Sequence, residues 1–201
     1  MNEKSVIIGM SGASGAIYTE RLIKALCEKE YMVHLIITKY AQYMIQTELE
    51  IQPQESFDNY LLRKYPHLNS HNIQIHLNQN LADPLASGSS SHGPMIVLPC
   101  SMKTLSSITH GYSAYLLERA ADVTLKENLP LILAPRETPL SIIHLENMLL
   151  ARQRGIQIVP AMPAFYQKPK TLDDIADFMA GRILNLLHIP HQLFPAWKEP
   201  N

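Results

Sequence analysis

"SVIIGMSGASGAIY", residues 5–18, decides the fold of this 201-residue chain. It begins with a short apolar run typical of a buried strand, passes through three glycines and continues as a helical pattern from about Ala16 to Glu28. The glycines are spaced G-x-x-G-x-x-G, which differs from the dinucleotide-binding spacing G-x-G-x-x-G. They allow a ligand to approach the backbone closely, and the helix start offers free N–H groups to an anion. On these residues alone, a tight turn capped by Ser14 remains an alternative.

The same alternation of strand and helix continues along the chain. Short apolar runs at 32–38, 72–77, 94–99, 130–135 and 155–161 predict strands, and the stretches at 39–50, 57–64, 136–153 and 171–188 predict helices. Two helical stretches are predicted between 100 and 127, with the clearer one at about 113–127. This alternation indicates an α/β fold with a parallel sheet and helices on both faces. We expect one domain over 1–190 and a tail over 191–201, whose Phe194 and Trp197 pack on a neighbouring subunit.

Composition excludes several classes of protein. The net charge of −1 favours neither nucleic acid nor an anionic membrane as a partner. The N-terminal apolar run has only about five residues, too short for a signal peptide, and no stretch approaches the roughly 20 apolar residues of a membrane span. Cys27 and Cys100 lie far apart in the sequence, which indicates reduced thiols and a cytoplasmic protein.

Polar residues at the strand ends indicate what the sheet binds. The second strand ends at Thr38 and Lys39, where a dinucleotide site usually has an acidic residue, so a mononucleotide is favoured over NAD. "PCSMKTLSSI" (99–108) follows the fourth strand and offers hydroxyls, an ammonium and helix N–H groups. Two such turns at one sheet edge suit a planar ligand that carries a phosphate.

Basic residues occur on two of the predicted helices. Thr171 and Asp174 begin the last helix as a capping box, and Arg182 falls within its apolar stripe, so it needs an anionic partner. A structural salt bridge and a ligand anion are both open at this point. Arg119 and Lys126 lie two turns apart on an earlier helix, where a solvated face with Asp122 pairing to both is the simpler interpretation.

Metal binding and nucleophilic catalysis find little support. The nine histidines include no HExxH pattern and lack the companion ligands of a zinc site, so no metal is expected. Cys100 and His144 could form a nucleophile–base pair, but a cysteine at a buried strand end is more often inert packing.

Five motifs together resemble the bacterial flavin prenyltransferases. They read "GMSGASGAIY", "LASGSSSHGPMIVLPCSMKTLSSITHGY", "LLERAADVTLKE", "APRETPLSIIHLENM" and "PAMPAFYQKPKTLDDIADFMAGRIL". The resemblance runs from Val6 to about Trp197, with residues 50–80 least alike. It implies a Rossmann-like, flavodoxin-like fold, a homododecamer, and FMN bound between subunits. The implied activity is metal-independent transfer of a dimethylallyl group from dimethylallyl phosphate to N5 and C6 of reduced FMN, and the prenylated FMN passes to a partner decarboxylase of the ubiquinone or aromatic-acid type.

The resemblance also implies roles for individual residues. Those expected to hold FMN are Gly12, Ala13, Ser14, Thr38, Ser101, Met102, Lys103, Thr104 and Arg136. Those expected to hold the dimethylallyl phosphate are Tyr166, Arg182, Arg119 and Lys126. For Arg119 and Lys126, this role implied by the resemblance replaces the interpretation of a solvated helix face. Those expected to move protons are Glu137, Glu48 and Ser14. Thr19 stands where the family often has glycine, and its effect should be structural.

Two rival functions remain. A cysteine-decarboxylase-type flavoprotein would share the fold and FMN, but that class needs an Asn-bearing "PASMNT"-like loop and a histidine near the first helix. This chain has Lys103 in the loop and no histidine over 14–25. A non-catalytic FMN carrier would need the flavin pocket but neither Glu137 nor the basic residues.

Overall fold

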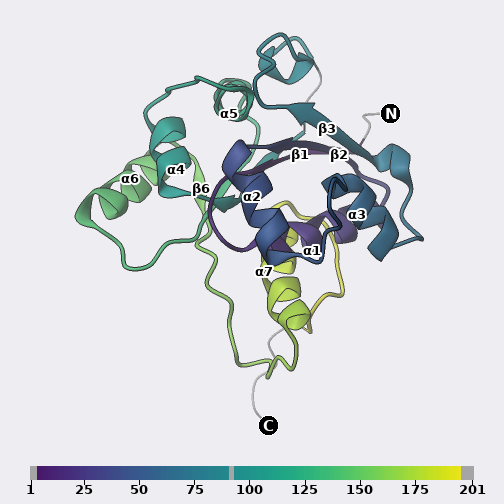
Figure 1. Cartoon of the computed structure of the whole chain (residues 1–201). Coiled ribbons are helices and arrows are strands. Elements are labelled where there is room, and N and C mark those ends of the chain that lie inside the picture. The colour runs from purple at the N-terminus through teal and green to yellow at the C-terminus, as the bar shows by residue number, and fades with distance from the viewer. Residues whose placement is uncertain (1–3, 91–92, 196–201) are drawn as a thin grey trace.

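A six-stranded parallel sheet forms the centre of the molecule (Figure 1). The computed structural model describes residues 4–90 and 93–195. The strand order is β3-β2-β1-β4-β5-β6, the order of a Rossmann-type sheet. The strands are β1 (Ser5–Met10), β2 (Met32–Ile37), β3 (Ile73–Leu77), β4 (Met95–Cys100), β5 (Leu131–Pro135) and β6 (Gln157–Ile158). Strand order therefore reverses between β1 and β4, the place where such sheets bind ligands.

Within the described residues, seven helices and two short 3₁₀ turns accompany the sheet. The helices are α1 (Ala16–Cys27), α2 (Lys39–Glu48), α3 (Phe57–Lys64), α4 (Met102–Thr109), α5 (Leu116–Lys126), α6 (Ile142–Gln153) and α7 (Leu172–Leu186), with η1 (Ser70–Asn72) and η2 (Pro84–Ala86). In the part of the chain that the structure describes, no helix is both long and apolar enough to cross a membrane.

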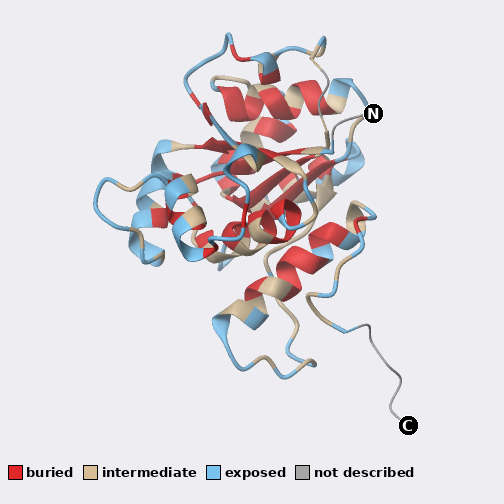
Figure 2. Ribbon diagram, turned by 90° about the vertical axis from the view of Figure 1, so that its right-hand side faces the viewer, coloured by how far each residue is buried: buried red, intermediate tan, exposed pale blue. Residues whose placement is uncertain are grey.

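Two apolar layers lie on opposite faces of the sheet, between its strands and the surrounding helices. Figure 2 shows the buried residues on the strands and on the helices. Side chains of β1 alternate between them, because successive residues of a strand face opposite ways. Ile8 packs with α1, α2, α3 and α7, whereas Ile7 packs with α4, α5, α6 and η2. The predicted α/β sheet with helices on both faces is confirmed.

Most predicted elements agree with the structure to within three residues at each end, and α3 over 57–64 agrees at both ends. The predicted strand over 155–161 is much shorter, because only Gln157 and Ile158 pair with β5. Val159 and Ala161 still donate backbone hydrogen bonds to β5 carbonyls, so the chain follows the sheet edge without forming a longer ladder.

Phe194 of the predicted tail packs on its own chain. Its ring centroid lies 5.0 Å from that of Phe178 on α7, and it lies over Gly181. Trp197 lies outside the described residues. Packing of the tail on a neighbouring subunit stays a prediction.

Candidate functional site

Three loops meet at the carboxyl edge of β1, β4 and β5. The hydroxyl of Ser11 accepts a hydrogen bond from the backbone N–H of Ser101 at 2.7 Å and donates to the carbonyl of Pro99 at 3.1 Å. The guanidinium Nε of Arg136 donates to the carbonyl of Ser14 at 3.1 Å. Sequence segments more than 80 residues apart are therefore joined, and the predicted FMN residues of these loops lie together at the point where strand order reverses.

The start of α1 is occupied by a carboxylate of the same chain. Glu48, the last residue of α2, accepts hydrogen bonds from the N–H groups of Gly15 and Ala16, both at 2.8 Å. The sequence-based interpretation that these N–H groups are free for an anion is therefore wrong. The alternative of a Ser14 cap is also wrong, since α1 has no side-chain cap hydrogen bond from its own N-cap. Glu48 provides the negative charge that a helix N-terminus favours.

At two positions, the turn between β1 and α1 has no room for a side chain. Gly15 has φ +120°, and a Cβ there would lie 2.8 Å from the ring of Tyr18. A Cβ at Gly12 would lie 2.5 Å from the Cβ of Tyr40. Both glycines are therefore required by the space and conformation of this turn.

Tyr18 is a site residue that the sequence reasoning missed. Its phenol is half-buried; burial raises its pKa, the Arg136 guanidinium opposes that rise, and the Glu48 carboxylate adds to it. Tyr18 thus interacts with two residues of the predicted site. Its position in the first turn of α1, directly after the glycines, was the available signal.

The loop after β4 begins α4 with a cap. The Ser101 hydroxyl accepts from the N–H of Thr104 at 3.4 Å and donates to the Thr104 hydroxyl at 3.1 Å. Met102 and Thr104 are buried, whereas Lys103 is exposed and its ammonium lies 3.3 Å from a carboxylate oxygen of Glu118 on α5. The Lys103 ammonium and the partly buried Ser101 hydroxyl lie on the same edge as Arg136, and such donors suit a phosphate and ring carbonyls.

Thr38 follows β2 and Glu137 follows β5, so both lie at the carboxyl edge of the sheet with β1 and β4 between their strands. The Thr38 side chain caps α2 by accepting from the N–H of Ala41 at 3.2 Å. Glu137 directly follows Arg136; its carboxylate is exposed and accepts from the N–H of Thr138 at 3.0 Å. The carboxylate of Glu137 can therefore reach a ligand beside Arg136.

Arg119 and Lys126 lie on α5, each beside an acidic side chain. Arg119 pairs with Asp122 at 2.6 Å, and Lys126 lies 3.6 Å from Glu127. The interpretation that Asp122 pairs with both is correct for Arg119 and wrong for Lys126. The reason is local: Glu127 is adjacent to Lys126 at the end of the helix, where both side chains are exposed.

Arg182 is exposed, so its predicted place inside the buried stripe of α7 is wrong. Phe178, Met179 and Ile183 of the predicted stripe are buried, but the buried face also extends over Ala176, Ala180 and Leu184. Ala180, Ile183 and Leu184 belong to the apolar layer that contains α1. This face is turned by about one residue from the stripe that the large apolar side chains suggested. The predicted capping box of Thr171 and Asp174 is confirmed.

One chain alone does not bring the four predicted phosphate ligands together. Arg119 and Lys126 are on α5 on one face of the sheet, whereas Arg182 is on α7 on the other (Figure 1). Tyr166, in the loop before α7, packs edge-on against Phe178 at 6.0 Å between ring centroids. The four predicted ligands therefore lie in two groups on opposite faces of the chain.

Cys100 does not act with His144. Cys100 is fully buried, and burial raises the pKa of its thiol. His144 forms a capping box with Ser141 at the start of α6. The interpretation of Cys100 as inert packing is confirmed.

The chain is similar in sequence to known flavoproteins over nearly its whole length. The sequence model of the flavoprotein family matches residues 1–184. The flavin prenyltransferase UbiX of Halalkalibacterium halodurans is 45% identical over 96% of this chain and 92% of that protein. The flavin prenyltransferase UbiX of Pseudomonas aeruginosa is 42% identical over 96% of this chain and 94% of that protein.

Solved structures of FMN-dependent proteins are similar to this chain as well. The crystal structure of AnUbiX (PadA1) in complex with FMN and dimethylallyl pyrophosphate has a TM-score of 0.88 and 36% identity, covering 99% of this chain and 100% of that one. The dodecameric FMN-dependent UbiX-like decarboxylase from Escherichia coli O157:H7 has a TM-score of 0.85 and 39% identity, covering 96% and 99%. A PPC decarboxylase mutant, at 15% identity and a TM-score of 0.63, shares the fold alone.

Proposed function

Because this chain belongs to the flavoprotein family and, within it, to the flavin prenyltransferases, we propose that it prenylates reduced FMN. The dimethylallyl group of dimethylallyl phosphate is transferred to N5 and C6 of the flavin, and a decarboxylase uses the product. The observation that carries this function is the junction of the β1, β4 and β5 loops through Ser11, Ser14 and Arg136, in a chain with such relatives. The cysteine-decarboxylase alternative is supported by fold likeness only.

The loop junction fits FMN through the chemistry of its donors. Arg136, Lys103 and the hydroxyls of Ser101 and Thr38 would hold the cofactor, together with the backbone of 12–14 and the remaining residues of 101–104. Because Glu48 already fills the start of α1, the FMN phosphate would lie at the start of α4 beside Lys103. When bound, reduced FMN supplies the two nucleophilic atoms that accept the prenyl group.

Basic side chains would bind the phosphate of the prenyl donor. As the allylic C–O bond breaks, negative charge grows on the phosphate oxygens, and fixed guanidinium and ammonium groups lower the barrier. Arg119, Lys126, Arg182 and the Tyr166 hydroxyl provide this environment. Four such donors can balance a monophosphate without a metal ion, so we propose a metal-independent enzyme.

Acidic side chains would move the protons. Alkylation at N5 and C6 would displace one proton from each atom; one would add to the prenyl double bond that ring closure consumes, and the other would go to the departing phosphate. Glu137 would carry the latter, because its carboxylate is exposed next to Arg136. Glu48 would hold the loop that carries Ser14 and, with Ser14, would relay protons to the flavin.

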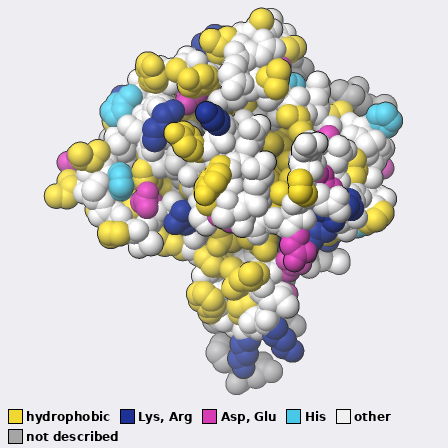
Figure 3. Space-filling view, in the orientation of Figure 1, with side chains coloured by type: hydrophobic (Ala, Val, Ile, Leu, Met, Phe, Trp, Pro, Cys, Tyr) yellow, Lys and Arg dark blue, Asp and Glu magenta, His cyan; other side chains and the backbone are white. Residues whose placement is uncertain are grey.

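A second subunit would complete the site. The two cationic parts lie on opposite faces of one chain, and closing them around one ligand requires another copy. Large apolar side chains are also exposed, and Figure 3 shows them spread over one face of the molecule. They include Tyr40, Tyr43, Leu77, Ile142, Ile143 and Leu149, each at least half exposed. These features support a homo-oligomer, for which a dodecamer is the proposed size.

The proposed location is the cytoplasm. Cys27 and Cys100 are free and buried, which is the state of thiols in a reducing compartment. The proposed partners are dimethylallyl phosphate, FMN and the decarboxylase, with neither nucleic acid nor membrane among them.

The test of the function is an anaerobic incubation with reduced FMN and dimethylallyl phosphate, followed by mass measurement of the extracted flavin. We expect the flavin to gain the mass of the prenyl group. An unchanged mass would reject the transferase, and the control without dimethylallyl phosphate fixes the baseline.

The test of the shared site mixes two impaired variants, Arg119→Ala and Arg182→Ala, by co-expression, at a dimethylallyl phosphate concentration below the raised KM of each. If the two residues come from different subunits, random assembly should give about one quarter of the sites both arginines and restore activity in proportion. If mixing restores no activity, both arginines act from one chain and the shared site is wrong.

A further inference from the structure

Helix α5, which carries Arg119, begins without a cap of its own. Its N-cap residue is Tyr115, whose side chain makes no cap hydrogen bond. The first N–H groups of any helix lack partners within the helix and need an acceptor from elsewhere. Leu116 and Leu117 are fully buried, so water cannot supply one. Some other residue must hold the start of this helix.

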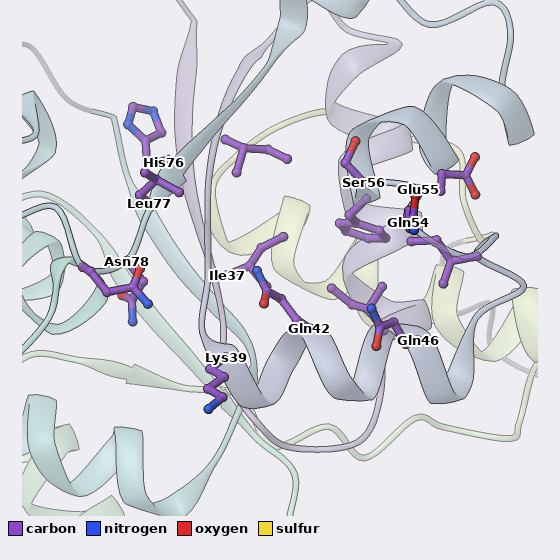
Figure 4. A pocket seen from close by; sticks show the side chains of 15 residues that line it. Ile37, Lys39, Gln42, Gln46, Gln54, Glu55, Ser56, His76, Leu77 and Asn78 are labelled. Atoms are coloured by element: carbon purple, nitrogen blue, oxygen red, sulfur yellow. The ribbon is translucent and has the colours of Figure 1, made fainter.

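Asn78 supplies both acceptors. Its backbone carbonyl accepts from the N–H of Leu116 at 2.8 Å, and its side-chain Oδ1 accepts from the N–H of Leu117 at 3.0 Å. Asn78 is 7% exposed and directly follows the last residue of β3, far from α5 in the sequence. Figure 4 shows Asn78 next to Leu77 and His76, at one end of a cavity of about 630 Å³ between α2 and β3. The residues lining this cavity include none of the predicted FMN or prenyl phosphate ligands.

The turn after Asn78 is held by a chain of hydrogen-bonded side chains. His76 lies two residues before Asn78 and so faces the same side of the strand. Its Nδ1 lies 2.8 Å from a carboxylate oxygen of Asp83, and its Nε2 lies 3.0 Å from Nδ1 of His34 on β2. The other Asp83 oxygen accepts from the N–H of Leu85 at 3.0 Å. The position of Asn78 is thus fixed by β2 and by the turn that leads into η2.

The same turn also contacts Arg119. The carbonyl of Ala86, at the end of η2, accepts from Nε of Arg119 at 3.1 Å. Asp122 accepts from Nη1 at 2.6 Å, and Nη2 makes no hydrogen bond to the residues over 4–90 and 93–195. Segment 78–86 therefore holds both the first turn of α5 and one side of the guanidinium, leaving Nη2 to a ligand.

We propose that Asn78 is a positioning residue for the prenyl transfer: by capping α5, it sets where the Arg119 guanidinium stands. The inference rests on the proposed role of Arg119 in binding the prenyl phosphate. Without the Asn78 side chain, the Leu117 N–H loses its acceptor and the first turn of α5 loosens. Arg119 lies within the next turn, and a small displacement of a phosphate-binding group strongly weakens catalysis.

The experiment is a double-mutant cycle with Asn78→Ala and Arg119→Ala. The measurements are KM for dimethylallyl phosphate, kcat, and the Kd for FMN from quenching of flavin fluorescence. We expect Asn78→Ala to raise KM roughly tenfold, in line with the loss of a buried cap, and to leave the FMN Kd within about twofold. Asn78→Asp keeps the acceptor, so its KM should lie close to that of the unsubstituted protein. Where Asn78→Ala does not fold, Asn78→Ser, which has a shorter acceptor, takes its place with the same expected pattern.

The cycle separates a positioning role from a structural one. If Asn78 acts through Arg119, then Asn78→Ala should change KM by less than about twofold when Arg119 is already alanine. The matched control is Asn69→Ala, which removes a comparable cap at η1 and should leave KM unchanged. An equal factor in both backgrounds, or an equal loss of FMN affinity, would overturn the inference. An unchanged KM in Arg119→Ala alone would reject the proposed role of Arg119 and, with it, this inference.

Discussion

Glu20 of α1 is a fully buried carboxylate, and Glu20→Gln should destabilise the protein strongly. Three donors reach it: the hydroxyl of Tyr60 at 2.8 Å, the hydroxyl of Tyr65 at 2.5 Å and the ammonium of Lys64 at 2.6 Å. All three donors come from α3 or the residue that follows it. The carboxylate therefore joins α1, which begins at the predicted FMN loop, to the segment over 50–80.

The magnitude follows from what the substitution leaves behind. Removing one partner of a buried ion pair costs about 3–5 kcal/mol. The Lys64 side chain is 36% exposed and can turn toward water, which places the expected loss near the lower limit, at about 3 kcal/mol. With a urea m-value of about 2 kcal/mol/M, the denaturation midpoint should fall by about 1.5 M.

The assay is urea denaturation followed by circular dichroism at one protein concentration, because assembly also stabilises the chain. The control is Glu28→Gln, which removes a partly exposed partner of Lys24 and should cost less than about 1 kcal/mol. If Glu20→Gln costs no more than the control, the network does not hold α3 to α1 and the reasoning is refuted.

Four further results are expected. Burial, hydrogen bonding to Glu20 and the charge of Glu20 raise the pKa of Tyr65 to about 12. The folded state then keeps a proton that the unfolded state releases above pH 10, so the free energy of unfolding should fall between pH 10 and 12. The fall should be smaller in Tyr65→Phe. Glu48→Ala should lower stability by about 1–2 kcal/mol in the same denaturation assay, and Glu48→Gln by less, since it keeps an acceptor for the start of α1. Glu137→Gln should bind FMN with unchanged fluorescence quenching yet form prenylated FMN at least about 100-fold more slowly, and normal product formation would remove Glu137 from the mechanism. Arg182→Ala should raise KM for dimethylallyl phosphate about tenfold or more with little effect on the FMN Kd, and equal losses would make Arg182 merely structural.

The sheet could be predicted from the sequence because its central strands are buried. β4 and β5 consist of residues with almost no exposure, so their apolar runs stand out between polar loops. Since the carboxyl ends of parallel strands meet at one edge, the loop junction followed from strand order. Arg136, Ser14 and Ser101 do lie together, as that argument required.

Contacts made by small or distant residues could not be predicted in this way. The buried face of α7 includes Ala176 and Ala180, whereas a hydropathy pattern gives more weight to Ile175 and Leu186, which are only partly buried. The position of Arg182 was therefore predicted on the wrong face. Glu48 reaches the start of α1 from another helix, and the residues next to α1 in the sequence give no sign of such a cap. Asn78 is a second case of the same kind.

Charge balance bears on the proposed cationic site before its ligand arrives. Arg119 and Lys126 each have an acidic neighbour, Asp122 and Glu127, so α5 adds little net charge in the single chain. Arg182 has no acidic partner among the described residues but is exposed to water, which solvates its charge. Bringing these groups together in an assembly removes water and raises their mutual repulsion. A phosphate monoester relieves that repulsion, so the assembled protein should bind the substrate more tightly than a single chain does.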